Sequence, residues 1–265
     1  MRVLECVINV SEAVAIGPIA AAGGDVVLDV HSDGHHNRSV LTLAAPSDDR
    51  LWEAVFAVSR RTIDLIDLTN HVGVHPRFGA LDVVPFVDLA SPEAPSTPRS
   101  VGARDRFARW AAKELGVPSF IYGPERSLPD VRSAARHGAT PDIGPAALHP
   151  TAGAVAVGAR GALVAYNLWV TTLDEARWVA TAVRRPGLRT LALSIGNRAQ
   201  VSCNLIEPYS CGPADAYDAV AALTPVEGAE LVGLLPQAVL ERIPSHRWPQ
   251  LDIGPAQTLE ARLPG

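Results

Sequence analysis

The order of predicted strands and helices is the feature that most limits the fold of this chain. Residues 2–10, 26–30, 39–45 and 80–89 have the apolar runs or alternation typical of strands. Helices are predicted over 12–22 and from Leu51 to about Asp67, with an N-cap offered by Ser47-Asp48-Asp49. The resulting order is β-α-β-β-α-β, a split β-α-β unit. A helix over 101–115, ended by Gly116, and a short strand over 118–122 follow it.

The second half of the chain repeats this order with different residues. Strands are predicted over 161–170, 188–195, 199–206 and 228–235, with helices over 171–185 and 213–223. Asn9 and Asn167 each lie near the end of a first strand, and an Asn-Arg pair stands at each hairpin, at 37–38 and 197–198. Two such units in tandem suggest a duplication.

The predicted fold is α/β (α+β), with two tandem ferredoxin-like βαββαβ subdomains over residues 1–150 and 151–265. Each sheet would carry helices on one face and leave an apolar face open. Stacking the two open faces, with the helices outside, would bury them and leave a cleft between the sheets. A linker over 123–152, with a short helix near 129–136, would join the units and line that cleft.

Composition narrows the classes of function. With 265 residues, 48% of them hydrophobic and 19% charged, the chain can bury a sizeable core. A net charge of −5 gives no general field to attract nucleic acid or an anionic membrane, so small molecules are the expected partners. Three cysteines without a CxxC spacing favour neither disulfides nor a thiolate zinc site. The cytoplasm is the expected compartment, and neither a signal peptide nor a membrane span is predicted.

The stretch HVGVHPRFGALDV, from His71 to Val83, is the main candidate for chemistry. His75 is predicted to act as a general acid and base, because only imidazole both takes and gives a proton near neutral pH. Pro76 would fix its backbone, and Arg77 would present a rigid fork to a substrate carboxylate. The structural alternatives are a loop cross-linked by the two histidines, a surface ion pair for Arg77, and a core or edge carboxylate for Asp82. Gly73 and Pro76 disfavour a helical zinc site.

A second polar cluster, DVHSDGHHNRSV over 29–40, is predicted to form a β-hairpin. Its histidines invite a metal assignment, but alternating strand side chains scatter their rings, so no metal is predicted. His35 and Asp33 are expected to be solvated turn residues. Asn37 and Arg38 start the returning strand and are predicted to point into the cleft.

The chain closely resembles the formimidoyltransferase family, folate-dependent enzymes of histidine breakdown that occur alone or fused to a cyclodeaminase. Seven blocks in the same order carry the resemblance and cover nearly the whole chain: ECVINVSE (5–12), LDV followed by HNRSVLT (36–42), HPRFGALDVVPF (75–86), PDIGP (141–145), GARGALVAYNL (158–168), QVSCNL (200–205) and GAELVGLLP (228–236). The resemblance implies two α/β subdomains with tetrahydrofolate between them as the co-substrate. It also makes a homodimer the expected assembly.

The same resemblance implies a one-carbon transferase in which the N5 nitrogen of tetrahydrofolate takes the formimidoyl group of N-formimidoylglutamate. His75 takes the place of the catalytic histidine. Arg77, Arg38 and Arg160 are expected to hold carboxylates or the folate tail, and Asn37 and His31 belong to the same substrate-binding set. The polar strand residues expected to hydrogen-bond the pterin edge are Asn9, Asn167, Gln200 and Asn204; the alternative for each is to satisfy backbone groups inside its sheet.

Three positions depart from the family pattern. Val74 and Val72 stand where the family has Glu and Lys, and His31 replaces a second aspartate. Losing the acidic neighbour removes a group that would raise the pKa of the catalytic histidine. An altered formimidoyl donor is therefore expected. Two alternatives remain: a folate-binding pseudoenzyme without transfer activity, and a hydrolase or cyclase that uses His31, His35 and His75, with or without a metal.

Overall fold

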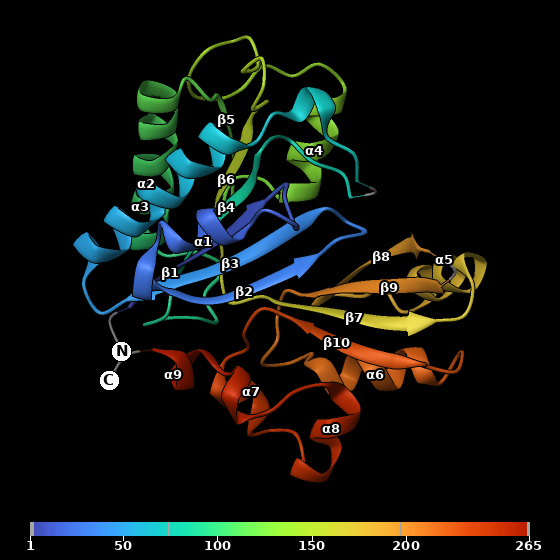
Figure 1. Cartoon of the computed structure of the whole chain (residues 1–265). Coiled ribbons are helices and arrows are strands. Elements are labelled where there is room, and N and C mark those ends of the chain that lie inside the picture. Colours follow the sequence, from blue (N-terminus) through green and yellow to red (C-terminus); the bar gives the residue numbers. More distant parts are fainter. Residues whose placement is uncertain (1–2, 74, 197, 264–265) are drawn as a thin grey trace. The chain divides into compact units, whose positions relative to one another are not determined.

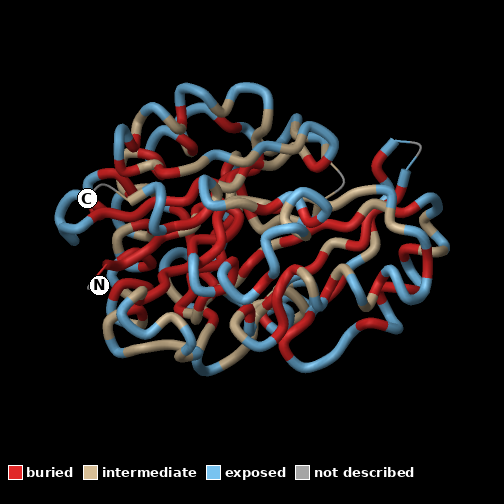
Figure 2. The backbone as a smooth tube through the Cα atoms, turned by 90° about the horizontal axis from the view of Figure 1, so that it is seen from below, coloured by how far each residue is buried: buried red, intermediate tan, exposed pale blue. Residues whose placement is uncertain are grey.

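The computed structural model describes residues 3–73, 75–196 and 198–263 and confirms the predicted α/β fold with two sheets (Figure 1). Its contacts divide the chain into two compact units, one ending at Gly161 and the other covering Ala162–Leu263. The strands of both units are largely buried, whereas most connecting segments are exposed (Figure 2). No helix in the described ranges has the length and apolar character needed to cross a bilayer.

The first unit contains the predicted βαββαβ order followed by an extension. Its sheet has the strand order β2-β3-β1-β4-β6-β5, in which β2, β3, β1 and β4 are antiparallel and β4, β6 and β5 are parallel. The elements in chain order are β1 (Leu4–Val10), α1 (Gly17–Ala21), η1 (Gly24–Val26), β2 (Val27–Asp33), β3 (Arg38–Ala45), α2 (Asp48–Leu65), η2 (Leu68–Asn70), β4 (Leu81–Asp88), α3 (Pro98–Trp110), η3 (Ala111–Leu115), β5 (Ser119–Tyr122), α4 (Leu128–Arg136) and β6 (Val155–Ala159).

The segment predicted as a linker is a crossover within the first sheet. The predicted short helix is confirmed as α4, and the chain then enters β6, a strand that the periodicity did not reveal. Because β6 pairs with both β4 and β5, the contacts divide the chain after Gly161, whereas the sequence placed the division after residue 150.

The two faces of the first sheet are covered differently. α1, α2 and α3 pack on one face over a core that contains Ile8, Leu41 and Phe86. On the other face, α4 packs with β5 and β6 through a smaller cluster that contains Phe120 and Val131. Figure 1 shows α2 and α3 on one side of β4, β6 and β5 and α4 on the other. α4 therefore places its side chains on the sheet face opposite the main core.

Local sequence signals explain most of the helix ends, with two exceptions in α2. Thr97 caps α3 in a capping box with Ser100, and Gly116 ends the following turn with a positive φ of 66°. Ser47 occupies the N-cap position of α2, but its side chain makes no capping hydrogen bond. Leu65, the last residue of α2, is exposed, and no glycine follows it to end the helix.

Pro85 lies in an interior strand, although proline in a strand is typical of an edge or a bulge. β4 lies between β1 and β6, and Pro85 is buried and aligned with Gly158 of β6. The register shift in the β1–β4 pair occurs at Asn9 and Val10, near the start of β4. An interior strand tolerates Pro85 because the missing N–H removes only one ladder hydrogen bond.

The second unit is a four-stranded antiparallel sheet in the order β10-β7-β9-β8. α5 and α6 pack on one face, over a core that contains Tyr166, Val179 and Val220. The Tyr166 hydroxyl donates to the Leu251 carbonyl oxygen at 2.8 Å and ties the C-terminal segment to the sheet. The elements are β7 (Val164–Val170), α5 (Leu173–Ala182), β8 (Leu188–Ile195), β9 (Arg198–Leu205), α6 (Pro213–Ala221), β10 (Gly228–Val232), α7 (Gln237–Leu240), η4 (Ser245–Arg247), α8 (Trp248–Leu251), η5 (Pro255–Gln257) and α9 (Leu259–Arg262).

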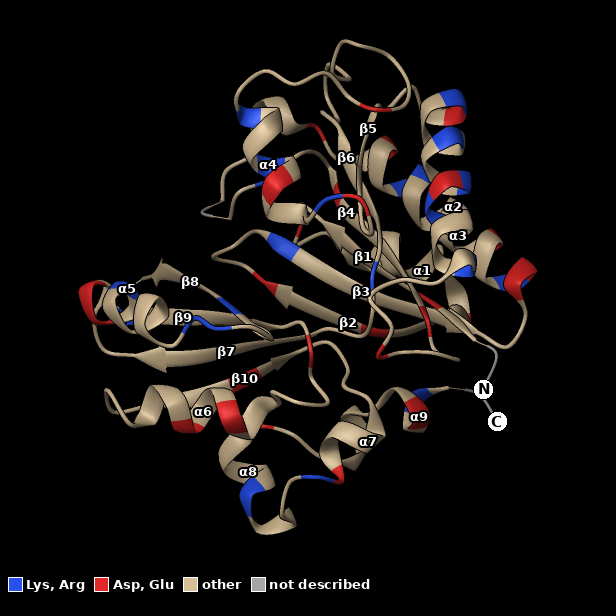
Figure 3. Ribbon diagram, turned by 180° about the vertical axis from the view of Figure 1, so that it is seen from behind, with Lys and Arg blue, Asp and Glu red and all other residues tan. Residues whose placement is uncertain are grey.

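Charges of both signs are spread along the outer surfaces of α2 and α3 (Figure 3). Some of them form ion pairs, such as Arg60 with Glu114 and Arg99 with Asp48. Exposed pairs of this kind stabilise a fold by about 1 kcal/mol or less. The ion pairs near His75 are more enclosed.

Candidate functional site

His75 lies in the loop between η2 and β4, and this loop is braced from within. The Arg77 guanidinium donates to His71 Nδ1, to the Gly73 carbonyl oxygen at 2.7 Å and to the His75 carbonyl oxygen at 3.0 Å. At Gly79 a Cβ atom would meet the Ala154 carbonyl oxygen at 2.0 Å, so only glycine permits this approach to the segment before β6. The expectation that His71 cross-links the loop fits this arrangement. Val74 lies outside the described residues.

A buried carboxylate, Asp82 at the start of β4, is the centre of the ionic network. It accepts hydrogen bonds from Arg38 of β3, from Arg132 of α4 at 2.9 Å, and from the Phe78 backbone N–H at 2.6 Å. Burial alone would raise its pKa, but the two guanidinium groups outweigh burial and lower the pKa below the ordinary value. Asp82 therefore carries a full negative charge, and this charge connects Arg38 of β3 to Arg132 of α4.

The His75 ring is attached to this network through Nδ1. Nδ1 lies 2.7 Å from the Pro76 carbonyl oxygen and 3.2 Å from Arg38 Nη1. Because Arg38 is a donor already directed at Asp82, the shorter contact favours the tautomer in which Nδ1–H donates to Pro76. In that tautomer Nε2 carries a lone pair, and no described residue hydrogen-bonds it.

The surroundings keep His75 neutral. Burial, together with the nearby Arg38 charge, lowers its pKa to about 3, although Asp82 acts in the opposite direction. Near neutral pH the ring is therefore a proton acceptor. An imidazolium formed here would be strongly acidic and would return its proton readily.

Asn9 and His31 lie on the same sheet face as Arg38. The Asn9 Oδ1 atom accepts from Arg38 Nη2 at 2.6 Å, and its Nδ2 donates to the Val7 carbonyl oxygen at 3.0 Å. In register, His31 and Asn9 both lie opposite Val40, so the three side chains occupy one row across β2, β3 and β1. Arg38 follows two residues from Val40, on the same face.

Asn37 and Arg160 lie apart from the Asp82 network. Asn37 adopts a positive φ of 47°, accepts from the Ala13 N–H at 3.2 Å and donates to the Val72 carbonyl oxygen at 2.8 Å, so it connects two loops. Arg160 follows β6, where its backbone N–H donates to the Phe86 carbonyl oxygen at 3.1 Å. It is therefore at the far end of β4 from Asp82.

The histidines of the hairpin do not form a metal site. His35 is exposed in the turn, as expected, whereas His36 is buried, with its ring centroid 5.8 Å from that of His75. Across residues 3–73, 75–196 and 198–263, no group of three or more His, Cys, Asp or Glu side chains is placed to hold a metal ion.

In the second unit two of the predicted polar residues meet on one carboxylate. Asn167 of β7 and Gln200 of β9 both donate to Glu230 Oε2, at 3.1 and 3.2 Å. Gln200 is fully buried, and its Oε1 atom has no hydrogen-bond partner in the described part of the chain. Asn204 is exposed on the same strand. Sequence reasoning missed Glu230, although it lies in one of the quoted blocks.

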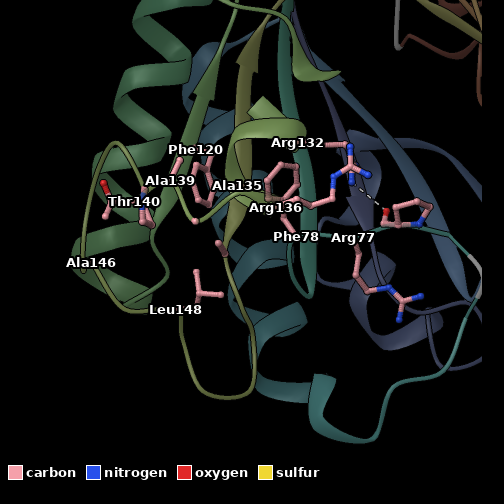
Figure 4. Close-up of a pocket in the computed structure, with 14 residues that line it drawn as sticks. Arg77, Phe78, Phe120, Arg132, Ala135, Arg136, Ala139, Thr140, Ala146 and Leu148 are labelled. Carbon is pink, nitrogen blue, oxygen red and sulfur yellow. Dashed lines mark hydrogen bonds between the residues drawn. The ribbon is translucent and has the colours of Figure 1, made fainter. Parts of the chain in front are cut away.

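A pocket of about 400 Å³ opens beside His75, between α4 and the loop that contains Pro76 and Arg77 (Figure 4). Phe78, Phe120 and Arg132 are among the residues that line it. Sequence reasoning missed Arg132, because it lies 50 residues from its partner Asp82 and no local pattern marks it.

Comparison with known proteins is consistent with these motifs. Residues 3–160 match the family model described as the formiminotransferase domain, N-terminal subdomain. A glutamate formimidoyltransferase from Streptococcus pyogenes serotype M1 is 34% identical in an alignment that covers 90% of this chain and 91% of that protein. One from Thermoplasma acidophilum is 33% identical, over 91% of this chain and 90% of that protein. A formimidoyltransferase-cyclodeaminase from Gallus gallus is 33% identical, and the match spans 51% of its length.

Proposed function

The chain belongs to the formiminotransferase family and is a transferase, and from this premise we propose that it moves a formimidoyl group from N-formimidoyl-L-glutamate, or a related donor, to N5 of tetrahydrofolate. One observation carries the proposal. His75 is a neutral imidazole whose Nδ1 contacts the Pro76 carbonyl and Arg38, while Nε2 is free among the described residues.

The proposed reaction uses His75 to move one proton. N5 of tetrahydrofolate attacks the formimidoyl carbon, a bond from N5 to this carbon forms, and Nε2 of His75 accepts the N5 proton. The bond from this carbon to the glutamate nitrogen then breaks, and Nε2 returns the proton to that nitrogen. The charge of Asp82 eases the first proton transfer, and the low pKa of His75 eases the second.

Arg38 and Arg77 support this reaction mainly as positioning residues. Both Nη atoms of Arg38 donate to Asp82 or Asn9, and those of Arg77 donate within the loop. Each guanidinium retains further N–H donors, so contact with a substrate carboxylate remains part of the proposal. Arg160, with one Nη on the Gly161 carbonyl oxygen at 2.8 Å, retains further N–H donors and is proposed to contact a substrate carboxylate.

The polar residues of the second sheet are proposed to recognise the folate ring. A carboxylate flanked by amides suits a pterin edge, because the ring presents adjacent N–H donors and a carbonyl acceptor. Glu230 would accept from the ring, and Gln200, whose Oε1 has no partner in the described ranges, would supply a further acceptor. Asn167 and Asn204 complete the proposed set.

The proposal extends to the cellular setting. The family names of the relatives suggest a place in histidine degradation, and the three buried free cysteines, Cys6, Cys203 and Cys211, suit a reducing cytoplasm. A homodimer is proposed as the assembly.

A second candidate, a folate-binding protein without transfer activity, is favoured by two observations. The low pKa of His75 makes it a weak base, and Val72, where the family has Lys, is 82% exposed and offers no charge to an acidic donor. The hydrolase or cyclase alternative gains no such support.

The test is a transfer assay on the purified chain. Tetrahydrofolate and N-formimidoyl-L-glutamate should give the absorbance of 5-formimidoyltetrahydrofolate, and His75→Ala should slow turnover by about 100-fold or more. His246→Ala, at an exposed histidine of η4, is the matched control and should keep the wild-type rate. Turnover unchanged in His75→Ala would overturn the mechanism. Tight binding of tetrahydrofolate without turnover of any formimidoyl donor would select the second candidate.

A further inference from the structure

The pocket beside α4, here called the α4 pocket, lies entirely in the first unit and is large enough for a small ligand. Its volume of about 400 Å³ is in the range of ligand sites. The fourteen residues that line it come from Pro76–Phe78, from Phe120 of β5, from α4, and from the segment between α4 and β6 (Figure 4). The Pro76 carbonyl oxygen, which contacts the His75 ring, accepts a hydrogen bond from Arg132 at 3.1 Å. The pocket is therefore coupled to the His75 loop.

All the charged side chains that line the α4 pocket are positive. Arg77, Arg132 and Arg136 line it, and no Asp or Glu is among the lining residues. Arg77 and Arg132 already donate to groups of the protein. Arg136, exposed at the end of α4, makes no ion pair or hydrogen bond with any described residue. The pocket thus contains one uncommitted guanidinium group, which suits a single carboxylate.

The remaining lining is apolar and includes two aromatic rings. The ring centroids of Phe78 and Phe120 are 5.5 Å apart, and the Arg132 guanidinium carbon lies 4.8 Å from the Phe78 centroid. Leu148 contributes a side chain that is 58% exposed and available to a ligand. Four alanines complete this surface: Ala135, Ala139, Ala146 and Ala154. Such a surface gains free energy when a flat apolar group covers it.

We infer that the α4 pocket binds a carboxylate attached to an aromatic ring or a similarly flat apolar group. The inference deepens the proposed function, on which it rests for the identity of the natural ligand. Two sources share this chemistry: the aminobenzoyl-glutamate part of a reduced folate, and a formimidoyl donor with an aromatic side chain in place of that of glutamate. Exposed Val72, where the family has Lys, agrees with a donor of reduced acidity.

Isothermal titration of the full chain with four probes tests the inference. 4-Aminobenzoyl-L-glutamate and N-formimidoyl-L-phenylalanine represent the two sources. L-glutamate lacks the ring, and 4-aminobenzamide lacks the carboxylate. At least one of the first two probes should bind about tenfold more tightly than L-glutamate, as expected for burial of a ring. Whichever of these two probes binds more tightly identifies the natural ligand as a reduced folate or as an aromatic formimidoyl donor.

Three variants locate the binding. Arg136→Gln should weaken the carboxylate probes about fivefold and leave 4-aminobenzamide unchanged, because only the charge contact is lost. Ala139→Phe should fill the pocket and weaken every ring-containing probe by about tenfold or more. Arg109→Gln, at an exposed arginine in the last turn of α3, is the matched control and should bind all four probes as the wild type does. Circular dichroism confirms that each variant is folded.

The outcomes separate this inference from the proposed function. It is overturned if neither aromatic carboxylate binds more tightly than both L-glutamate and 4-aminobenzamide, or if Arg136→Gln and Ala139→Phe bind with wild-type affinities. Probe binding without formimidoyl transfer would keep the α4 pocket and reject the transferase mechanism. Formimidoyl transfer without binding of any aromatic carboxylate probe would keep the transferase mechanism and reject the ligand inferred for the α4 pocket.

Discussion

The two units share a strand order, but the carboxylate at the centre of each polar cluster has different partners: arginine side chains in the first unit and amide side chains in the second. In the first unit Asn9 of β1, Arg38 of β3 and Asp82 of β4 are connected by hydrogen bonds. The corresponding strands of the second unit carry Asn167, Gln200 and Glu230, which are also connected.

The registers show that two of these three positions correspond. Asn9 lies opposite Val40, two residues from Arg38, and Asn167 lies opposite Ser202, two residues from Gln200. Glu230 pairs directly with Asn167, whereas Asp82 lies next to Val83, the partner of Asn9. The correspondence favours the duplication that the sequence suggested.

The two carboxylates, Asp82 and Glu230, have different partners in the same strand arrangement. Guanidinium groups compensate the buried charge of Asp82 and keep it ionised beside His75, whose pKa is lowered by burial and by the nearby Arg38 charge. Two amide groups, of Asn167 and Gln200, donate to Glu230 instead. Under the proposed function, the first arrangement would serve proton transfer and the second would serve recognition of the folate ring.

The largest expected effect comes from removing the first carboxylate. Asp82→Asn leaves the partly buried Arg38 and Arg132 beside a neutral amide, and the free energy of unfolding should fall by about 3 kcal/mol. Glu230→Gln keeps a hydrogen-bond acceptor beside two amides and should cost about 1 kcal/mol. Urea unfolding of both variants measures the difference. Equal losses would contradict the comparison. Asp174→Asn, which breaks an exposed ion pair with Arg177, is the control.

The next effect is a pH dependence specific to the first unit. The pKa of His75 is about 3 in the folded protein, below its ordinary value of 6.5, so the unfolded chain binds a proton first as the pH falls. His75 should therefore reduce stability between pH 6.5 and 3, by at most about 1.4 kcal/mol per pH unit. Asp82 contributes separately, below its ordinary value of 3.8.

Comparing the wild type with His75→Gln isolates this pH effect. The difference in their free energy of unfolding should change steadily between pH 6.5 and 4, in favour of the variant at lower pH. A difference that stays constant over this window would mean that His75 keeps an ordinary pKa.

A smaller effect distinguishes the two asparagines. Asn9→Ala removes the acceptor for Arg38 and should lower kcat of formimidoyl transfer about fivefold with little change in the Kd for tetrahydrofolate, because the Arg38 contact to His75 is loosened. Asn167→Ala should raise that Kd about fivefold with little change in kcat. Titration with tetrahydrofolate and steady-state kinetics check both variants. Reversed or identical effects would break the division of tasks.

The smallest effect compares two helix starts. Thr172 caps α5 in a capping box with Glu175, whereas Ser47 makes no capping hydrogen bond at α2. Thr172→Ala should therefore cost about 1 kcal/mol of unfolding free energy, and Ser47→Ala only a few tenths. Thermal unfolding of both variants measures the two losses. A larger loss for Ser47→Ala would show that Ser47 caps α2 in solution.

Much of the fold could be predicted because its signals are local. The period of the apolar residues identified the strands of both βαββαβ units, and Gly116 marked the end of its helix. β6 was missed because a short run of alanine and valine resembles the segments around it, and its identity depends on two partner strands. The strand that contains Pro85 is interior for the same reason, because β6 pairs with it on its outer side.

The sequence by itself determined the family and the order of elements within the two βαββαβ units, and it made His75 beside Pro76 the candidate for catalysis, because these follow from residues that are neighbours in the chain. Only the tertiary structure decided that Asp82 joins Arg38 to Arg132, that Glu230 joins Asn167 to Gln200, and that α4 forms a pocket beside the His75 loop. Each of these depends on side chains brought together from distant segments. Their charge and burial, and therefore their pKa values, are set by neighbours that no local pattern identifies.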